Sequence, residues 1–345
     1  MLGKPLMTLF TRRNFAKSLA GVAMAPLVEA SFCSNAFAAD PATTVALLLP
    51  GSVADGGWNT LAYQGLEALK AAGFKVAFTE SVKQDQLEQV IRGYGDDGVN
   101  LIIGHGYEYG SAFGEIAPSY PKSSFFASTF KPEGRVPANV EYVNLAYLQV
   151  SYVAGALAAL ISDRGKAVGF VGGGDNPTQQ AMMRSFIIGA EKTRPGIKGL
   201  GIVTGDYNNA AKGREAATTM IGNGADVIWH AADVTGLGAI QGAAASKVKA
   251  IGCYDDQSSI APDFVAVSFQ QRLAWVVEQV GHSVADKTFA GGQEWSPSLA
   301  QAWLALYGKA PYNAKLVTSD AWAKFEAVWK DVDAKKIDVA ALTKA

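Results

Sequence analysis

Aromatic and polar side chains recur where short apolar runs of this 345-residue chain end. A flat ligand can stack on the ring of a Trp or Tyr, while Asp and Asn side chains meet its N–H and O–H groups. This combination of residue types indicates a site for a small, flat solute. The candidate ligand-binding residues are Asp55, Trp58, Asn59, Tyr107, Trp229, Tyr254 and Asp256.

Several of these residues also have a purely structural interpretation. Trp58 could anchor the core, and Trp229 could pack inward from the end of its strand. Asp55 could cap the helix that follows it, since Asp is favoured at that position. Asp256, in an Asp-Asp pair, could be a cap, a hinge element or a ligand contact.

Signatures of catalysis and of cofactor binding are absent from the sequence. The run Gly172-Gly-Gly174 follows a strand but does not complete a dinucleotide-binding motif, and there is no phosphate-binding loop or nucleophile elbow. The three histidines are too dispersed for a short metal-binding motif. The net charge of −1 gives no indication that the chain binds nucleic acid, which would favour a basic protein. We therefore predict no enzyme, no catalytic residue, no metal and no cofactor.

The elements that must position the candidate residues alternate between strand and helix. Short apolar runs at 45–50, 75–79 and 101–104 indicate buried strands, with helical patterns between them. After a long helix the alternation restarts at 167–171 and continues through 199–203. Two successive α/β units predict two lobes with parallel sheets and a ligand cleft beyond the carboxyl ends of the strands.

The beginning of the chain has the three-part pattern of an export signal. Arg12 and Arg13 precede an apolar run at 19–28, and Ala36-Phe37-Ala38 gives an Ala-x-Ala exit. Adjacent arginines are typical of the twin-arginine route. We expect cleavage after Ala38 and a periplasmic protein.

Motifs along the chain occur in the same order as in a known family. The segment Asp55-Gly-Gly-Trp58-Asn59 with the following Ala62, Gly65 and Leu66 resembles the D-x-x-[FW]-N-x-x-A-x-x-G-L signature of the basic-membrane-protein family. These are purine-nucleoside-receptor-like substrate-binding proteins of ABC importers. Further similar segments, in order, are 120–125, 151–155, 168–173, 224–228, 251–257 and 310–313.

The resemblance implies an α/β protein with the type I periplasmic-binding fold, two Rossmann-like lobes with a hinge and an interlobe cleft. The expected N-terminal lobe is 39–147 plus about 256–292, and the C-terminal lobe is 148–255 plus about 293–345. Trp58 lies where the family stacks an aromatic ring on the base, and Trp229 lies at a second stacking position. The implied partners of this expected monomer are a small-molecule ligand and the membrane permease and ATPase subunits of an ABC transporter.

Some positions depart from the family pattern. Tyr254 stands where a ribose-binding Asp is expected, Gln271 aligns near an expected Lys, and Asp233-Val234 replaces a Gly-Gly pair. We therefore expect a purine-like ligand (nucleobase or nucleoside) or another flat heteroaromatic solute. The alternatives are a receptor for an unrelated small solute, a secreted nucleoside hydrolase and a ligand sensor for a membrane kinase.

Overall fold

The computed structural model describes residues 43–128 and 134–344. The predicted export signal at 1–38, with its arginine pair and its cleavage position, lies outside the described residues. Within the described ranges, no helix combines the length and the apolar character needed to cross a membrane.

The first of two six-stranded sheets is built entirely from parallel strands. It comprises β1 (Thr44–Leu48), β2 (Lys75–Thr79), β3 (Leu101–Gly104), β4 (Ser124–Ala127), β5 (Val140–Val143) and β11 (Gln293–Trp295). The order across the sheet is β2-β1-β3-β4-β5-β11. β1, β3 and β5 are almost completely buried, as expected for parallel strands that are covered on both faces.

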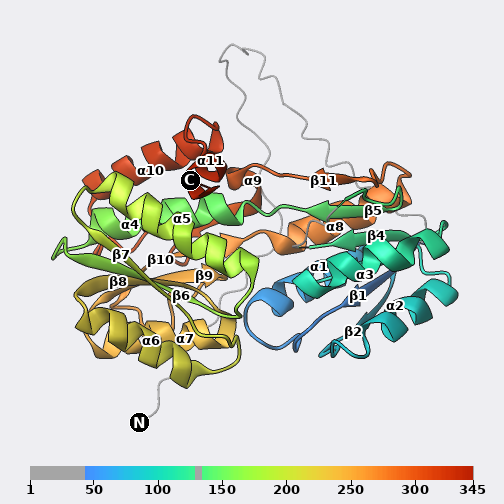
Figure 1. Cartoon of the computed structure of the whole chain (residues 1–345), viewed down its shortest axis with the longest axis horizontal. Coiled ribbons are helices and arrows are strands. Elements are labelled where there is room, and N and C mark those ends of the chain that lie inside the picture. Colours follow the sequence, from blue (N-terminus) through green and yellow to red (C-terminus); the bar gives the residue numbers. More distant parts are fainter. Residues whose placement is uncertain (1–42, 129–133, 345) are drawn as a thin grey trace, which may run out of the picture. The chain divides into compact units, whose positions relative to one another are not determined.

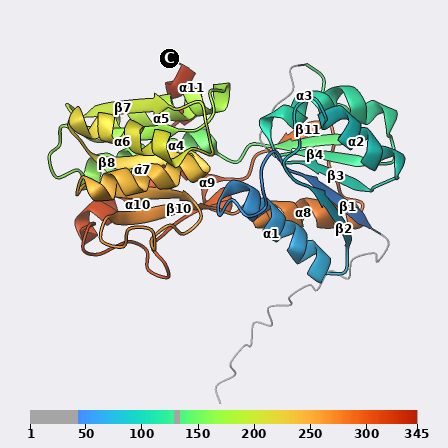
Figure 2. The same cartoon turned by 90° about the horizontal axis from the view of Figure 1, so that it is seen from below.

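Helices cover both faces of this first sheet (Figure 2). They are α1 (Trp58–Ala71), α2 (Leu87–Asp96), α3 (Tyr107–Ile116) followed by the short 3-10 helix η1 (Ala117–Ser119), and α8 (Leu273–Ala285). Alternate residues of a strand face opposite sides of the sheet. Leu47 accordingly belongs to the cluster that includes α1 and α8, whereas Leu48 packs with Ile91 of α2 and Phe113 of α3.

The second sheet repeats this arrangement. It comprises β6 (Ala167–Gly172), β7 (Lys198–Val203), β8 (Ala225–Ala231), β9 (Lys249–Tyr254), β10 (Val265–Gln271) and β12 (Trp303–Leu306). The order is β7-β6-β8-β9-β10-β12, which matches the first sheet position by position, with only the edge strand β12 antiparallel.

The helices of the second lobe lie above and below its sheet in Figure 1. They are α4 (Tyr147–Ile161), α5 (Pro177–Thr193), α6 (Ala210–Gly222), α7 (Asp233–Ala245), α9 (Leu299–Ala302), α10 (Ser319–Asp333) and α11 (Val339–Lys344). Small residues bring α4 and α5 together. A Cβ on Gly155 would lie 2.0 Å from the Phe186 carbonyl oxygen, and one on Gly189 would lie 2.1 Å from that of Tyr152. Only glycine permits this approach of the two backbones.

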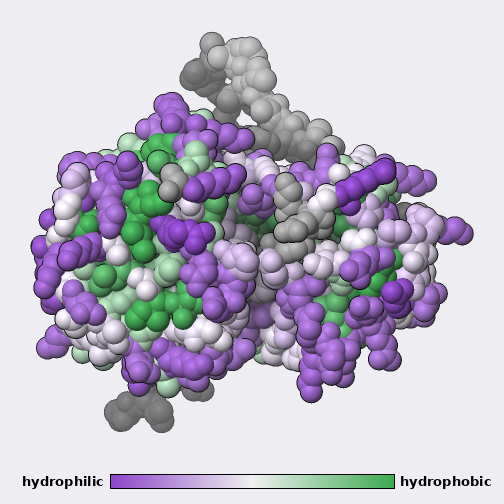
Figure 3. Space-filling model, viewed as in Figure 1, coloured by the Kyte–Doolittle hydropathy of each residue, from purple (hydrophilic) through white to green (hydrophobic). Residues whose placement is uncertain are grey.

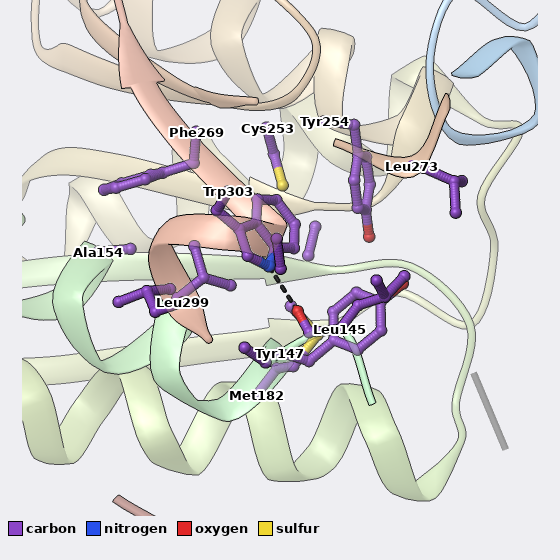
Figure 4. Packing of buried hydrophobic residues seen from close by; sticks show 14 of the residues in the cluster. Leu145, Tyr147, Ala154, Met182, Cys253, Tyr254, Phe269, Leu273, Leu299 and Trp303 are labelled. Atoms are coloured by element: carbon purple, nitrogen blue, oxygen red, sulfur yellow. Dashed lines mark hydrogen bonds between the residues drawn. The ribbon is translucent and has the colours of Figure 1, made fainter. Parts of the chain in front are cut away.

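The chain passes between the sheets three times, at residues 144–146, 272 and 296–298. A cluster of buried residues extends across this region, from Leu47 of the first sheet to Trp303 of the second. The Trp303 indole N–H donates a hydrogen bond to the carbonyl oxygen of Leu145 in the first passage (Figure 4). The passages are therefore packed against the core and are not loose tethers.

Two strands depart from the predicted lobe boundaries. β10 lies inside the segment 256–292, which was expected in the N-terminal lobe, but it pairs with β9 of the second sheet. β11 lies in the segment expected in the C-terminal lobe, but it pairs with β5 of the first sheet. The physical reason is that β10, buried between β9 and β12, completes the second sheet before the chain crosses.

Hydrophilic residues cover much of the face seen in Figure 3, while hydrophobic residues gather mainly on the lobe at the left. Among the described residues, the exposed large hydrophobic side chains are Phe78, Tyr107 and Leu304. Tyr107 is also a predicted ligand contact.

Candidate functional site

A cavity of about 260 Å³ lies at the carboxyl ends of strands from both sheets. Ligands of open α/β sheets bind at this position. The residues that line it from the first lobe follow β1 and β3 and are Pro50, Gly51, Trp58, Asn59, Tyr107 and Glu108. Those that line it from α4 and the second lobe are Tyr147, Asn176, Thr178, Gln179, Met182, Tyr207, Asn208, Asp233 and Tyr254.

Trp58 is the first residue of α1, and its ring packs against the buried His105, which does not line the cavity. The ring centroids of Trp58 and His105 are 3.5 Å apart, with their planes inclined by 35°. His105 Nε2 lies 3.2 Å from the Trp58 carbonyl oxygen, and Nδ1 lies 2.9 Å from Ser128 Oγ. Burial lowers the pKa of His105 to about 3, so the ring is neutral. Because a carbonyl can only accept, Nε2 carries the proton and Nδ1 accepts from Ser128.

Asp55 stabilises the loop that precedes Trp58 in the sequence. It does not line the cavity. Its carboxylate accepts hydrogen bonds from the backbone N–H groups of Gly57, Asn59 and Thr60, at 2.9–3.0 Å. It also accepts from Asn59 Nδ2 at 2.7 Å and from Thr60 Oγ1 at 2.9 Å. Burial acts to raise the pKa of Asp55, but these hydrogen bonds outweigh it and keep the pKa below its usual value. Asp55 is therefore a helix-capping anion that fixes Asn59 at the cavity wall.

Asp233 begins α7 and faces the cavity from the second lobe. It is only 8% exposed, and its Oδ1 has no hydrogen-bond partner among residues 43–128 and 134–344. Burial raises the pKa of Asp233 to about 7; the negative charge of Asp55 acts in the same direction and the Trp58 backbone amide opposes it. The cavity therefore contains a buried acid that titrates near neutral pH.

Four tyrosines add aromatic surface to the cavity lining: Tyr107, Tyr147, Tyr207 and Tyr254. The side chains of Tyr147, Met182 and Tyr254 belong both to the packed cluster of Figure 4 and to the cavity wall. Burial raises the pKa of Tyr147, Tyr207 and Tyr254, so each keeps its hydroxyl proton at neutral pH. With Trp58, these rings can contact a flat ligand on several sides.

Trp229 is not part of this lining. It is fully buried and stacks on Phe186 at 5.7 Å with an interplanar angle of 20°. β8 continues to Ala231, so Trp229 lies inside the strand, where its neighbours are Phe170 and Ile251. This position corrects the prediction that Trp229 stacks on the ligand: it is a core residue.

Asp256 also lies away from the cavity. Its side chain is exposed, and Oδ1 accepts a hydrogen bond from the Ser258 backbone at 3.0 Å. Four of the predicted contacts line the cavity: Trp58, Asn59, Tyr107 and Tyr254. Asp55 does not line it but bonds Asn59, which does. Asp256 stabilises a surface turn.

Other wall residues were missing from the predicted set. Glu108, Tyr207 and Asp233 lie in strand-end segments of the same kind as the predicted contacts, so their position in the sequence was a usable signal. Tyr147 and Gln179 lie on helices, and nothing in their sequence context distinguishes them from core residues.

Comparison with known proteins gives a consistent family assignment. A family described as "ABC transporter substrate-binding protein PnrA-like" matches residues 42–339. The chain is 28% identical to "Basic membrane protein A" of Borreliella afzelii over 255 residues, 72% of this chain and 78% of that one. It is also 28% identical to "ABC transporter nucleoside-binding protein BmpA" of Lactococcus lactis over 214 residues, 56% and 60% of the two chains.

A solved ABC transporter solute-binding protein of Aeropyrum pernix K1 has the same fold. The TM-score is 0.75 at 19% identity, over 85% of this chain and 92% of that one. The predicted type I periplasmic-binding fold is thereby confirmed. This chain belongs to the PnrA-like family of ABC transporter substrate-binding proteins, extracytoplasmic proteins that bind small ligands and work with permease and ATPase subunits.

Proposed function

We propose that this protein is the receptor of an ABC importer and binds a purine-like or other flat heteroaromatic solute between its two lobes. The observation that carries this proposal is the aromatic cavity at the facing strand ends, where Trp58 is backed by His105. A rigid indole at a cavity wall favours stacking on a planar ring. The relative named as a nucleoside-binding protein adds support for a base-containing ligand.

The polar groups of the wall suit the edges of such a ligand. Asn59 Oδ1 is buried and has no hydrogen-bond partner in the part of the chain that is described. Asn176 and Gln179, at the start of α5, face the cavity from the second lobe. Amide side chains both donate and accept, so they can pair with the ring nitrogens and exocyclic groups of a heterocycle.

We further propose that the lobes close on the ligand by motion at the three passages between the sheets. Each passage is short, and each joins elements that are themselves well packed. This is the arrangement of a hinge between rigid bodies. The closed form would present both lobes to the permease.

Ligand-induced stabilisation tests this function. Purified protein is heated with nucleobases, nucleosides, flavins and sugars, and its melting temperature is recorded. A ligand at 100 times its dissociation constant stabilises a protein by about 2.7 kcal/mol, which is easily detected. Shifts with purines or other flat heterocycles would support the proposal, whereas shifts with sugars alone would contradict it. Free base released from inosine would instead favour a nucleoside hydrolase.

We also propose that residues 1–38 direct export by the twin-arginine route. The test replaces Arg12 and Arg13 by lysine and follows the protein in the periplasmic fraction. Loss of export is expected. If the double variant is still exported, the general secretion route handles this protein.

A further inference from the structure

Glu108 and Asp233 are part of the cavity lining, and among residues 43–128 and 134–344 that lining contains no Lys, Arg or His. Neither acid takes part in an ion pair within the same ranges. A ligand that carries a phosphate or carboxylate would meet two acids and no basic side chain of the described lining.

Glu108 lies at the beginning of α3 and is part of the cavity lining. Its carboxylate folds back over Gly106, where a Cβ would lie only 2.6 Å from Glu108 Oε2. Burial raises the pKa of Glu108, and its own backbone amide partly opposes this. The acid is thus partly removed from water at the point where it meets the cavity.

One carboxylate oxygen of the buried Asp233 lacks a hydrogen-bond partner in the described part of the chain. Its Oδ1 makes no hydrogen bond with any described residue, and the side chain is more than nine-tenths buried. A buried acceptor without a donor costs free energy, so a donor supplied by a ligand would be stabilising. Asp233 also has a φ of +45°, a left-handed conformation that is uncommon for residues other than glycine.

The helix dipoles do not neutralise the charges of Glu108 and Asp233. The N-terminus of a helix carries about half a positive charge, and Glu108 and Asp233 each lie in the first turn of a helix, α3 and α7. An ionised carboxylate beside half a positive charge leaves each pair net negative, which for Asp233 holds above its pKa of about 7. Asp55, ionised nearby, adds to this field, because its charge helps to raise the pKa of Asp233.

Aromatic faces complete the arrangement. Trp58 and four tyrosines surround the same cavity, and a cation over an aromatic face is attracted by the electrons of the ring. In the described lining, aromatic walls and two acids without a base together favour a positively charged ligand.

We propose that the ligand is an organic cation, a flat heteroaromatic solute whose positive charge is held between Glu108 and Asp233. This inference rests on the proposed function and narrows it to ligands that are cationic at neutral pH. Neutral purines would then be weaker ligands, and anionic nucleotides would be excluded.

Matched pairs of compounds that differ in charge test this proposal. Nicotinamide is compared with 1-methylnicotinamide, and adenosine with 1-methyladenosine, by calorimetric titration at pH 8. Choline is included as a cation without an aromatic ring. At least one cationic member should bind about tenfold or more tightly than its neutral partner.

Two variants assign that preference to the acids. Asp233→Asn keeps the size of the side chain and tolerates the left-handed conformation, and Glu108→Gln keeps the shape of the glutamate. Each should reduce the preference for the cation, measured as the ratio of the two dissociation constants, about tenfold. The matched control is Glu115→Gln, an exposed glutamate on α3 outside the cavity, which should keep the full preference.

The pH dependence gives an independent readout. The titratable groups that interact with Asp233 are Asp55, Tyr207, Cys253 and Tyr254. Asp55 stays ionised because its pKa is lowered, and the other three stay protonated because burial raises their pKa. With a pKa of about 7, Asp233 loses its proton between pH 6 and 8, so cation affinity should rise about tenfold over this range. Asp233→Asn should abolish this part of the rise.

The outcomes separate this inference from the proposed function. If neutral heterocycles bind as tightly as their cationic partners, or if both acid variants keep the full preference, the charge inference is wrong and the proposed function stands. If choline binds and no heterocycle does, the proposed flat ligand is wrong. If no heterocycle of either charge binds and choline does not bind, both proposals fail.

Discussion

The two tryptophans predicted to hold the ligand lie in opposite environments. Trp58 stands at the beginning of α1, half-buried at the cavity wall, with its rear face against His105. Trp229 stands in the middle of β8, without solvent exposure, among Phe170 and Phe186. Trp229 lies two residues before the end of β8 and is enclosed by the core, whereas Trp58 lies beyond β1 on a helix and reaches the cavity.

The polar neighbours of the two rings differ in the same way. Around Trp58, the capping hydrogen bonds of Asp55 fix the loop, so the indole is presented by a rigid frame. Around Trp229, the neighbours are aromatic and the ring fills volume. The surroundings of Trp58 hold its ring at the cavity, where a ligand can contact it. The surroundings of Trp229 stabilise the second lobe, which forms the opposite wall of the cavity.

Trp229→Ala should have the largest effect on stability. Removing a fully buried Trp leaves a cavity in the core, and such substitutions cost about 3–5 kcal/mol. Urea unfolding should therefore show a strongly reduced midpoint. Trp229→Phe, which restores most of the volume, should recover much of the loss. A stable Trp229→Ala variant with impaired ligand binding would reverse the assignment of the two tryptophans.

Trp58→Ala should act mainly on ligand binding. Losing the stacking surface removes about 1 kcal/mol beyond buried area, so affinity should fall roughly tenfold or more. The measurement is calorimetric titration with the best ligand of the thermal screen, and Trp58→Phe is the control that keeps a stacking ring. The loss of unfolding free energy should be smaller than for Trp229→Ala, since Trp58 is only half-buried. Unchanged affinity would remove Trp58 from the site.

The sequence predicted the two α/β units, although not the lobes that β10 and β11 join, because buried strands appear as short apolar runs. The apolar runs at 45–50 and 101–104 and the restart at 167–171 predicted two α/β units, and the strands formed there. The residue at which a strand ends is harder to predict from the sequence. β8 continues to Ala231, two residues beyond Trp229, so Trp229 lies within the strand and packs in the core.

The site itself was only partly predictable. Tyr254, the last residue of β9, and Asn59, at the beginning of α1, were found from their type and position. Asp233 was recognised in the sequence as a departure from the family pattern, but its burial, its left-handed backbone and its raised pKa arise from packing across the two lobes. Such properties depend on neighbours that are far apart in the sequence, as Asp55 is from Asp233.

Asp55→Ala should have a moderate effect on stability, because it removes a cap. The backbone N–H groups of Gly57, Asn59 and Thr60 would lose their acceptor, and loss of a capping side chain costs about 1 kcal/mol. The pKa of Asp233 should fall as well, since the charge of Asp55 helps to raise it. Urea unfolding measures the first effect, and the pH dependence of cation binding measures the second. An unchanged unfolding midpoint would contradict the capping role.

Asp256→Ala should have the smallest effect, although Asp256 and Asp55 were predicted as ligand contacts of the same kind. Its carboxylate is exposed, lies outside the cavity lining and accepts a local hydrogen bond from the Ser258 backbone. Surface substitutions of this type change the unfolding free energy by no more than about 0.5 kcal/mol. Ligand affinity, measured by the same titration, should equal that of the unmodified protein. A clear loss of affinity would mean that closure of the lobes brings Asp256 to the ligand, and the wall of the second lobe would then extend beyond the strand end of β9.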